Sequence, residues 1–552
     1  MSDSPAAALT QDVVHALEHA DFYPHRPAAV EHVQTHISHV FLAGPYVYKL
    51  KKAVRFSFLD FSTAAQREHF CREELRLNAR LCPSVYLDVV PITRDAEGRL
   101  ALGGAGEVVE HVVWMRRLPA GRMLTTLVAH DAVTPGMIEA LATTLATFHA
   151  AAPTGPEIAK HAEPERLEAR WTENIRGAEA FAGGLLAAED HAVLADFGPT
   201  FVRTHETLLR ARQQAGRIRE GHGDLHAEHV CFVDAPAAGA GDREPLAAGI
   251  YIFDCIEFSR PFRCNDVACE IAFLAMDLER LERPDLARHL VAAYATAADD
   301  PLVDTLFPFY GSYLASVRGK VEALESIAAD VEPSDRVAAE AVARRHFALA
   351  VRYAWQAAGP AVIACCGLSG SGKTTLAVEL AARTGFALLG TDTIRRRLAG
   401  VASGSATAGG AAAYGAGRYT ATAREAVYQT LCAEADAALA AGRGVIADAT
   451  FIRAADRERL ALIARRHRLP CIFVECQARA EAVRSRLEAR DRTPSISDAR
   501  WDTYVAQRAQ FEPFAATEPH MVVETSGSPD AVRADALRRL WEWRHGRLPR
   551  GV

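Results

Sequence analysis

A glycine-rich stretch in the second half of the chain carries the residues that phosphate binding needs. Residues 367–374, GLSGSGKT, match the pattern G-x-x-x-x-G-K-S/T, with an apolar run before them and a helical pattern after them. In such a loop the glycines let backbone N–H groups converge on phosphate oxygens, the lysine reaches the terminal phosphates, and the threonine hydroxyl can hold Mg²⁺. We therefore expect a nucleotide site made by Gly367, Ser369, Gly370, Ser371, Gly372, Lys373, Thr374 and Thr375, with Thr374 also a metal ligand.

Three later residues indicate transfer of a phosphoryl group to an acceptor. Asp392 closes a predicted strand and could accept the proton of an acceptor hydroxyl, while Arg395 could hold an anionic group of the acceptor or the transferred phosphoryl. Asp448 closes the next strand, where it could serve the Mg²⁺. The alternatives are a helix N-cap aspartate with a solvated arginine for the first two and a turn aspartate for the third.

A helical segment further along, VRSRLEARDR, carries arginines that could close over a triphosphate as a lid. These candidates are Arg484, Arg486 and Arg490. An arginine-rich helix face that is simply solvated explains the same pattern equally well.

The first half of the chain contains a second set of candidates around GHGDLHAEHVCF. Asp224 lies in this segment, and Asp254 follows at the end of the apolar run YIFD. Two aspartates at neighbouring strand ends suit an ATP–Mg²⁺ site of the protein-kinase type, in which the first serves the acceptor hydroxyl and the second holds metal. Five residues after Asp224, where such a loop normally has Asn, stands His229. A histidine nitrogen suits Zn²⁺ or Mn²⁺ better than Mg²⁺, so His229 is either a poor Mg²⁺ ligand or a packing residue.

Two residues upstream could complete this second site. Lys49, in the predicted strand VYKLKK, is placed to bind phosphate, and Glu74, on the predicted helix that follows, could form its ion pair. The segment VVWMRRLP (112–119) is a candidate hinge for the adenine ring. A solvated lysine tip is the usual alternative for a lone strand lysine, but the order of all these features favours the kinase interpretation.

The predicted elements place both sets of residues on separate domains. Short strands around residues 35–52 and 85–118 enclose a helix over 63–81, and helical patterns dominate 130–220 and 266–356. From residue 361 onward apolar strands alternate with helices, at FALLGTD, GVIADAT, CIFVECQ and HMVVETS. We expect an α+β domain over 1–345 and an α/β domain with a parallel sheet over 358–552. The Ala/Gly-rich stretch 401–417 is expected to be a surface loop.

Composition narrows the class of protein. The chain has 552 residues, 49% of them apolar, and a formal net charge of −7, so no overall positive field points to nucleic acid or a membrane. No secretory signal pattern and no apolar run long enough for a membrane span are visible, and the eleven cysteines show no disulfide or zinc spacing. A cytoplasmic protein is expected.

The second half resembles the small-molecule and polynucleotide kinases of the P-loop class, including the zeta-toxin-like and gluconate-kinase-like groups of the AAA family. The resemblance rests on the order strand, P-loop, D-x-x-R, strand aspartate and arginine-rich helix. It implies that Asp392 is the catalytic base, that Arg395 acts beside it, and that Arg486 and Arg490 bind ATP. Thr450 and Arg457 also match the family pattern.

The first half resembles the aminoglycoside phosphotransferase and choline kinase families, which share the protein-kinase-like fold. THISHVFL, VYKLKK, FLDFST and ELRLNARL look like a bacterial branch in which this domain is fused ahead of a P-loop kinase domain, described as bifunctional. The resemblance implies that Asp224 is the catalytic aspartate and Asp254 the metal aspartate, with Asp266 a structural acid. The chain departs from the family at His229 and by lacking a glycine-rich flap over the phosphates.

These features predict two ATP–Mg²⁺-dependent kinases in one chain, each acting on a small hydroxylated acceptor. One alternative makes the N-terminal domain a non-catalytic regulator, and another makes the C-terminal domain an NTPase switch. A nucleic-acid 5′ end stays among the alternative acceptors of the P-loop domain.

Overall fold

The computed structural model describes residues 5–56, 59–234, 246–328, 331–400, 420–490 and 500–547. The chain forms two compact units, unit 1 with Met1–Trp171 and Thr200–Ala315, and unit 2 with Thr172–Pro199 and Ser316–Val552. The boundary expected near 345–358 falls inside unit 2, because the helices before it pack with the P-loop region. For example, α13 (Pro333–Ala357) packs on α14 (Lys373–Thr384), and the Trp355 and Trp541 rings meet with centroids 5.0 Å apart.

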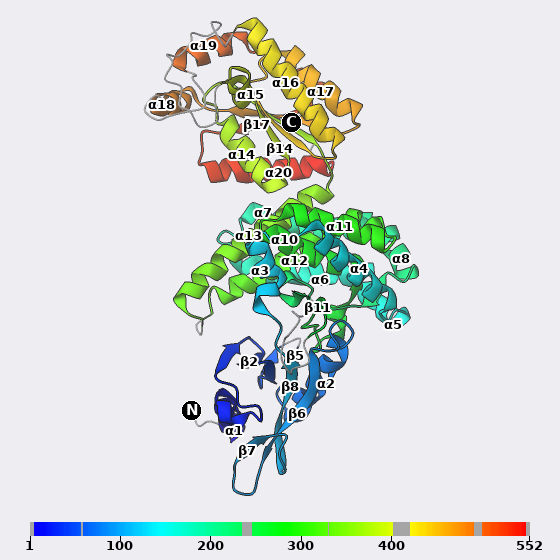
Figure 1. Cartoon of the computed structure of the whole chain (residues 1–552). Helices are drawn as coiled ribbons and strands as arrows, with labels where there is room; N and C mark the ends of the chain where they lie inside the picture. The colour runs from blue at the N-terminus through cyan, green and yellow to red at the C-terminus, as the bar shows by residue number, and fades with distance from the viewer. Residues whose placement is uncertain are drawn as a thin grey trace. The chain divides into compact units, whose positions relative to one another are not determined.

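Unit 1 contains a six-stranded antiparallel sheet in the order β1-β2-β3-β8-β6-β7. Its strands are β1 (Val30–Gln34), β2 (Ser38–Ala43), β3 (Tyr46–Lys51), β6 (Tyr86–Arg94), β7 (Leu100–Leu102) and β8 (Glu107–Arg116). Helix α2 (Ala64–Asn78), which begins at a Thr63 capping box, packs against β6 and β8 (Figure 1). The expected strands and helix are confirmed, and β1 is an addition that the sequence analysis did not foresee.

Strand alternation in β3 decides which side chains reach the candidate site. Tyr48 and Leu50 pack into an apolar cluster with Val13 and Leu17 of α1 (Pro5–Glu18). Because successive side chains point to opposite faces, Lys49 and the other odd-numbered residues of β3 project toward the opposite face.

The rest of unit 1 is mainly helical, with three short two-stranded pairs. The pairs are β4 (Arg55–Phe56) with β5 (Leu59–Asp60), β9 (Ile218–Glu220) with β12 (Cys264–Asp266), and β10 (Val230–Val233) with β11 (Gly249–Ile252). The helices are α3 (Leu124–Ala129), α4 (Pro135–Ala151), α5 (Pro156–Ala159), α8 (Glu206–Gln214), α9 (Arg260–Arg263), α10 (Val267–Arg280) and α11 (Pro284–Ala297). Helices α6 (Pro164–Ala178), α7 (Ala188–Thr204) and α12 (Leu302–Glu325) contribute residues to both units.

Unit 2 is built on a five-stranded parallel sheet in the order β14-β15-β13-β16-β17. The strands are β13 (Val362–Cys366), β14 (Ala387–Gly390), β15 (Val445–Asp448), β16 (Cys471–Gln477) and β17 (His520–Glu524), at the places expected from the sequence. Helices α14 and α20 lie on one side of this sheet and α16 and α17 on the other (Figure 1). Further helices of unit 2 are α15 (Thr391–Leu398), α16 (Ala421–Ala440), α17 (Ala454–Arg466), α18 (Ala480–Arg490), α19 (Trp501–Gln510) and α20 (Pro529–Arg544).

The cysteines and the helices of the described residues bear on disulfide formation and membrane crossing. All eleven cysteines lie in the described part of the chain, and each is free. Among the described residues no helix combines the length and apolar character that crossing a membrane requires. The stretch 401–417 lies outside the described residues.

Candidate active sites

Two carboxylates of α10 accept hydrogen bonds from the backbone of the loop that carries Asp224. Glu270 accepts a hydrogen bond of 2.6 Å from the Gly223 N–H and one of 2.8 Å from His149 Nε2. A Cβ at Gly221 would lie 2.3 Å from Glu270 Oε1, so any larger residue would displace this carboxylate. One helical stretch further on, Asp277 accepts from the Ala227 N–H at 2.9 Å. The sequence analysis missed both acids, although two carboxylates seven residues apart share one face of an otherwise apolar helix.

His222 ties this loop to the end of β11. Its Nε2 donates to the Phe253 carbonyl at 2.9 Å, and its Nδ1 accepts from the Asp224 N–H at 3.2 Å. Burial lowers the pKa of the ring to about 4, which keeps it in the neutral form that this pattern requires. Asp224 and Asp254 are thereby fixed on adjacent backbone segments.

Lys49, Glu74 and Asp254 come together as the sequence predicted. Lys49 Nζ lies 3.0 Å from Glu74 Oε1 and contacts Asp254 Oδ1 directly. Burial opposes the charged form of Asp254, but Lys49 outweighs this effect and lowers the pKa of the carboxyl below its ordinary range. Asp254 has φ of +64°, in the left-handed region that aspartate tolerates, and its N–H donates to the Tyr86 hydroxyl at 3.2 Å. A strand lysine, a helix glutamate and a strand-end aspartate therefore share one site.

A second lysine, Lys51, was missed by the sequence analysis. Its Nζ lies 2.7 Å from Glu74 Oε2 and contacts Glu257 Oε1, so Glu74 is shared between Lys49 and Lys51. Burial raises the pKa of Glu257 although Lys51 opposes the shift. The signal was present in VYKLKK, since residues two apart in a strand point to the same face.

His229, at the end of the short 3-10 turn Ala227–His229, lies between the two aspartates. Its Nδ1 is 2.8 Å from the Asp224 carbonyl oxygen, and its Nε2 is 3.6 Å from Asp254 Oδ2. Burial, reinforced by His226, lowers the pKa of the ring. His226 lies beside it, with Nε2 3.5 Å from Asp224 Oδ2. Asp224, His226 and His229 offer ligand atoms within 4.8 Å of one another, and His226 was not among the predicted residues.

Asp266, expected to be structural, lies away from these contacts. Arg212 donates to both of its carboxylate oxygens, at 2.5 and 2.6 Å, and the Ala268 N–H donates to Oδ1 at 2.9 Å as a helix cap.

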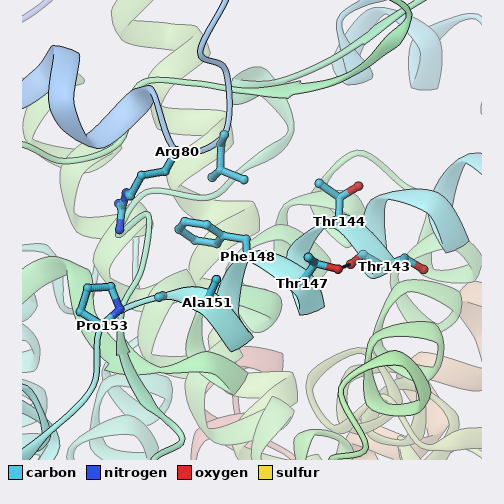
Figure 2. Close-up of a pocket in the computed structure, with 9 residues that line it drawn as sticks. Arg80, Thr143, Thr144, Thr147, Phe148, Ala151 and Pro153 are labelled. Atoms are coloured by element: carbon cyan, nitrogen blue, oxygen red, sulfur yellow. Dashed lines mark hydrogen bonds between the residues drawn. The ribbon is translucent and has the colours of Figure 1, made fainter.

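A groove of unit 1 lies along α4 and is lined by residues other than the candidate aspartates. Figure 2 shows its lining, in which Phe148 and Arg80 face one another and the Thr147 hydroxyl donates a hydrogen bond to the Thr143 carbonyl. The groove has a volume of about 520 Å³. Arg80 donates to the Glu220 and Gly221 carbonyls, each at 2.8 Å, so this arginine supports the chain leading into the Asp224 loop.

The P-loop of unit 2 has the backbone that the motif predicts. Gly367, Gly370 and Gly372 have φ values of +133°, +82° and +88°. A Cβ at Gly367 would lie 2.6 Å from the Cys476 carbonyl oxygen. Ser371 Oγ is buried and has no hydrogen-bond partner within the described residues, so it is available to a ligand. Lys373 and Thr374 begin α14, where the helix N-terminus favours an anion.

The residues predicted to act on the acceptor and on Mg²⁺ lie at the carboxyl edge of the same sheet. Asp392 and Arg395, both on α15, contact each other directly. Asp448 ends β15, and its backbone carbonyl accepts from Thr391 Oγ1 at 3.2 Å. A Cβ at Gly390 would lie 3.8 Å from Asp448 Oδ2, which places this carboxylate next to the start of α15.

The three lid candidates differ in what they contact. Arg486 donates to the Gly370 carbonyl at 3.4 Å and to the Thr525 carbonyl at 2.5 Å, directly at the P-loop. Arg484 pairs with Glu488 at 3.1 Å, one helical turn away on the same helix. The side chain of Arg490 lies outside the described residues. Sequence analysis also missed Gln507, whose Oε1 accepts from the Ser369 N–H at 2.8 Å.

The two remaining family matches have neighbours within the protein. Arg457 is fully buried, lies 2.7 Å from Glu518 Oε1 and donates to the Phe451 carbonyl at 3.2 Å. The Thr450 carbonyl accepts from the Gly367 N–H at 3.3 Å. Thr450 thus contacts the first P-loop glycine, whereas Arg457 joins Phe451 to Glu518.

Comparison with known proteins assigns both halves. Residues 43–241 match the model of the phosphotransferase enzyme family, and residues 362–514 match that of an AAA domain. An uncharacterized protein of Mycobacterium tuberculosis strain H37Rv is 32% identical over 487 residues, which cover 85% of this chain and 90% of that protein. An uncharacterized protein of Mycobacterium bovis matches to the same extent.

The chain belongs to the same family as these mycobacterial proteins. It joins a kinase-like phosphotransferase domain to a P-loop AAA domain. Among solved structures, a choline/ethanolamine kinase family protein from Mesorhizobium loti is 14% identical, covers 61% of this chain and 98% of its own, and has a TM-score of 0.33. A gluconokinase from Sinorhizobium meliloti is 16% identical. The match covers 35% of this chain and 98% of the gluconokinase, with a TM-score of 0.24.

The residues of the AAA domain fit ATP with Mg²⁺. The glycine backbone leaves room for phosphate oxygens, and the hydroxyl of Thr374 and the carboxylate of Asp448 are the oxygen ligands that Mg²⁺ prefers. The phosphotransferase domain fits only in part. Asp254 offers oxygen, whereas His229 presents a ring nitrogen where an amide oxygen is usual.

Proposed function

We propose that the chain is an ATP-dependent phosphotransferase with two transfer sites, each of which phosphorylates a small hydroxylated acceptor. In both sites the acceptor oxygen forms a bond to the γ-phosphorus as the bond to the bridging oxygen breaks, and ADP leaves. The acceptor proton goes to a carboxylate of the protein, Asp224 in unit 1 and Asp392 in unit 2. Mg²⁺ bound with the nucleotide at the AAA domain would offset negative charge on the phosphates.

One observation carries the proposal for unit 1. Lys49 contacts both Glu74 and Asp254, so a phosphate-binding cation and a metal-binding carboxylate are already oriented beside the Asp224 loop. This arrangement holds Lys49 charged, because Asp254 and Glu74 outweigh burial and raise its pKa. A charged, fixed lysine can neutralise phosphate without reorganisation when the nucleotide binds.

Unit 2 supports transfer through its own residues. Arg395 neutralises Asp392 in the resting site, and an anionic acceptor or phosphoryl group would compete for the same guanidinium. Release from Arg395 leaves Asp392 able to accept the acceptor proton. Arg486 is placed at the P-loop backbone, where it can contact phosphate oxygens.

A second candidate function for unit 1 is favoured by His229. With a nitrogen in the place of an amide oxygen, unit 1 could bind a nucleotide without transferring phosphate and act as a regulator of unit 2. An NTPase switch in unit 2 has less support, because hydrolysis needs neither an acceptor base nor the Asp392–Arg395 pair.

The deciding experiment follows ATP consumption by the full chain with sugars, nucleosides, polyamines, aminoglycosides and oligonucleotide 5′ ends as acceptors. Asp224→Ala and Lys373→Ala are compared with the wild-type protein, and Asp234→Ala is the matched control for an aspartate outside both sites. Each of the two site variants should abolish turnover of a different acceptor, while the control keeps both. If Lys373→Ala removes all turnover and Asp224→Ala removes none, unit 1 is not a transferase. Equal ATP consumption with and without every acceptor would support the switch.

A further inference from the structure

The tautomer of His229 is fixed by its neighbour. The Asp224 carbonyl oxygen, 2.8 Å from His229 Nδ1, can only accept a hydrogen bond, so Nδ1 carries the hydrogen. A neutral ring then has its lone pair on Nε2. That lone pair lies on the side of Asp254, whose Oδ2 is 3.6 Å away.

Two acceptors that face each other in this way repel unless a proton or a metal cation lies between them. Ligand atoms of a four-coordinate metal with bonds of about 2.1 Å lie roughly 3.4 Å apart, close to the separation of His229 Nε2 and Asp254 Oδ2. The other oxygen of Asp254, Oδ1, contacts Lys49. The two oxygens of this carboxylate thus serve different partners, which leaves Oδ2 on the side of His229.

Further donors stand next to this pair. His226 Nε2 lies 3.5 Å from Asp224 Oδ2, and the rings of His226 and His229 have centroids 4.0 Å apart. The cluster therefore offers imidazole nitrogens together with carboxylates. Mg²⁺ demands oxygen ligands, whereas Mn²⁺, Co²⁺ and Zn²⁺ accept imidazole nitrogen.

We propose that unit 1 binds a nitrogen-accepting divalent cation between His229 Nε2 and Asp254 Oδ2, in preference to Mg²⁺. Asp224 and His226 lie beside the His229 ring, and the ligand atoms of these three residues are within 4.8 Å of one another. This site deepens the transfer function proposed for unit 1, because it states which metal class that site takes. Metal binding is measured without nucleotide or acceptor, so either idea can fail while the other holds.

The test uses the full chain with Mn²⁺ as the probe and no nucleotide. Electron paramagnetic resonance measures free Mn²⁺ during a titration, and electron spin-echo modulation detects nitrogen bound directly to Mn²⁺. The wild-type protein should show imidazole nitrogen coupling. The variant His229→Asn supplies an oxygen instead, so it should lose that coupling and bind Mn²⁺ about tenfold more weakly. Excess Mg²⁺ should displace Mn²⁺ more readily from the variant.

Two further variants make the result specific. His467→Asn alters a histidine that lies 2.7 Å from Asp436 in unit 2, and it should keep both the coupling and the affinity. Asp254→Asn should weaken Mn²⁺ binding while keeping the size of the side chain, which tests the site even if His229→Asn fails to fold. The AAA-domain ligands Thr374 and Asp448 offer only oxygen, so nitrogen coupling reports on unit 1. Absence of coupling in the wild-type protein, or coupling and affinity unchanged in His229→Asn, overturns the proposal.

Discussion

The ammonium group of Lys51 and the carboxylate of Glu74 form an ion pair of 2.7 Å in which both side chains are completely shielded from solvent. Lys51 also contacts Glu257, so a single buried cation links β3, α2 and the segment that follows Asp254. Glu74 in turn holds Lys49 through its other oxygen. The position of Lys49, which we propose binds phosphate, therefore depends on a second lysine that need not touch any ligand.

Replacing this cation should destabilise unit 1. Lys51→Met leaves Glu257 and one oxygen of Glu74 buried without a partner, and breaking such a pair costs about 3–5 kcal/mol. Urea unfolding measures the loss in free energy of unfolding, and hydrogen exchange of peptides from β3 and α2 shows whether these elements open more readily. Lys160→Met, which removes the exposed pair with Glu157, should cause no measurable change. Equal unfolding curves for the two variants would mean that Lys51 contributes nothing to this network.

Asp190 should make the stability of unit 2 depend on pH. Burial raises the pKa of this carboxyl to about 6, although Arg383, at 3.0 Å, opposes the shift. The folded protein thus holds a proton that the unfolded chain releases, so this group adds stability as pH falls from about 6 toward 3.8. The gain is at most about 3 kcal/mol and is lost above pH 6.

The neutral variant Asp190→Asn isolates this effect. Its stability relative to the wild-type protein should be highest near pH 7.5 and should shrink toward pH 4.5, as measured by urea unfolding of unit 2 at each pH. A difference that stays constant over this range would show that Asp190 does not titrate as its burial implies.

Local sequence patterns were sufficient to predict the main elements and many of the residues that lie together at the candidate sites. The P-loop and the five strands of unit 2 each follow from a short pattern whose chemistry is nearly independent of the rest of the chain. Lys49 and Asp254 lie 205 residues apart and were linked only through the order of features typical of a kinase fold. Lys51 belongs to no such order of features, and its partner Glu257 also lies far away in the sequence, at 206 residues. A pairing over that distance depends on the folded arrangement of β3 and the turn after β11, which no local pattern specifies.

Dependence on long-range packing also explains why the sequence did not reveal Glu270 and did not distinguish Arg486 from Arg484. Glu270 acts on Gly221 and Gly223 through packing of α10 under the loop, so its role appears only when both are in place. The helix pattern of VRSRLEARDR could not separate Arg486 from Arg484, since the partner of Arg486 is the P-loop backbone. The sequence therefore names the arginines as candidates without ranking them.

The first P-loop glycine should be intolerant of any side chain. Gly367→Ala places a Cβ 2.6 Å from the Cys476 carbonyl oxygen, and the backbone must shift to relieve this contact. Nucleotide binding to unit 2 should then be lost, as measured by titration with a fluorescent ATP analogue. Gly442→Ala is the matched control, because Gly442 also has a positive φ, +71°, but a Cβ there meets nothing within 4 Å. Retained binding in Gly367→Ala would contradict a tightly fitted phosphate loop.

Arg486 and Arg484 should have unequal effects on ATP binding. Arg486→Ala removes a guanidinium that lies at Gly370 and Thr525, so the affinity of unit 2 for ATP should fall about tenfold, the size expected for one lost hydrogen bond to a charged group. Arg484→Ala removes an exposed pair with Glu488 and a contact with the Trp501 ring rather than a contact with Gly370, and it should leave the affinity unchanged. Calorimetric titration of both variants, in a background that carries Asp254→Asn to silence unit 1, gives the comparison. Equal losses in the two variants would indicate a general effect of helix charge, and equal retention would remove Arg486 from the nucleotide site.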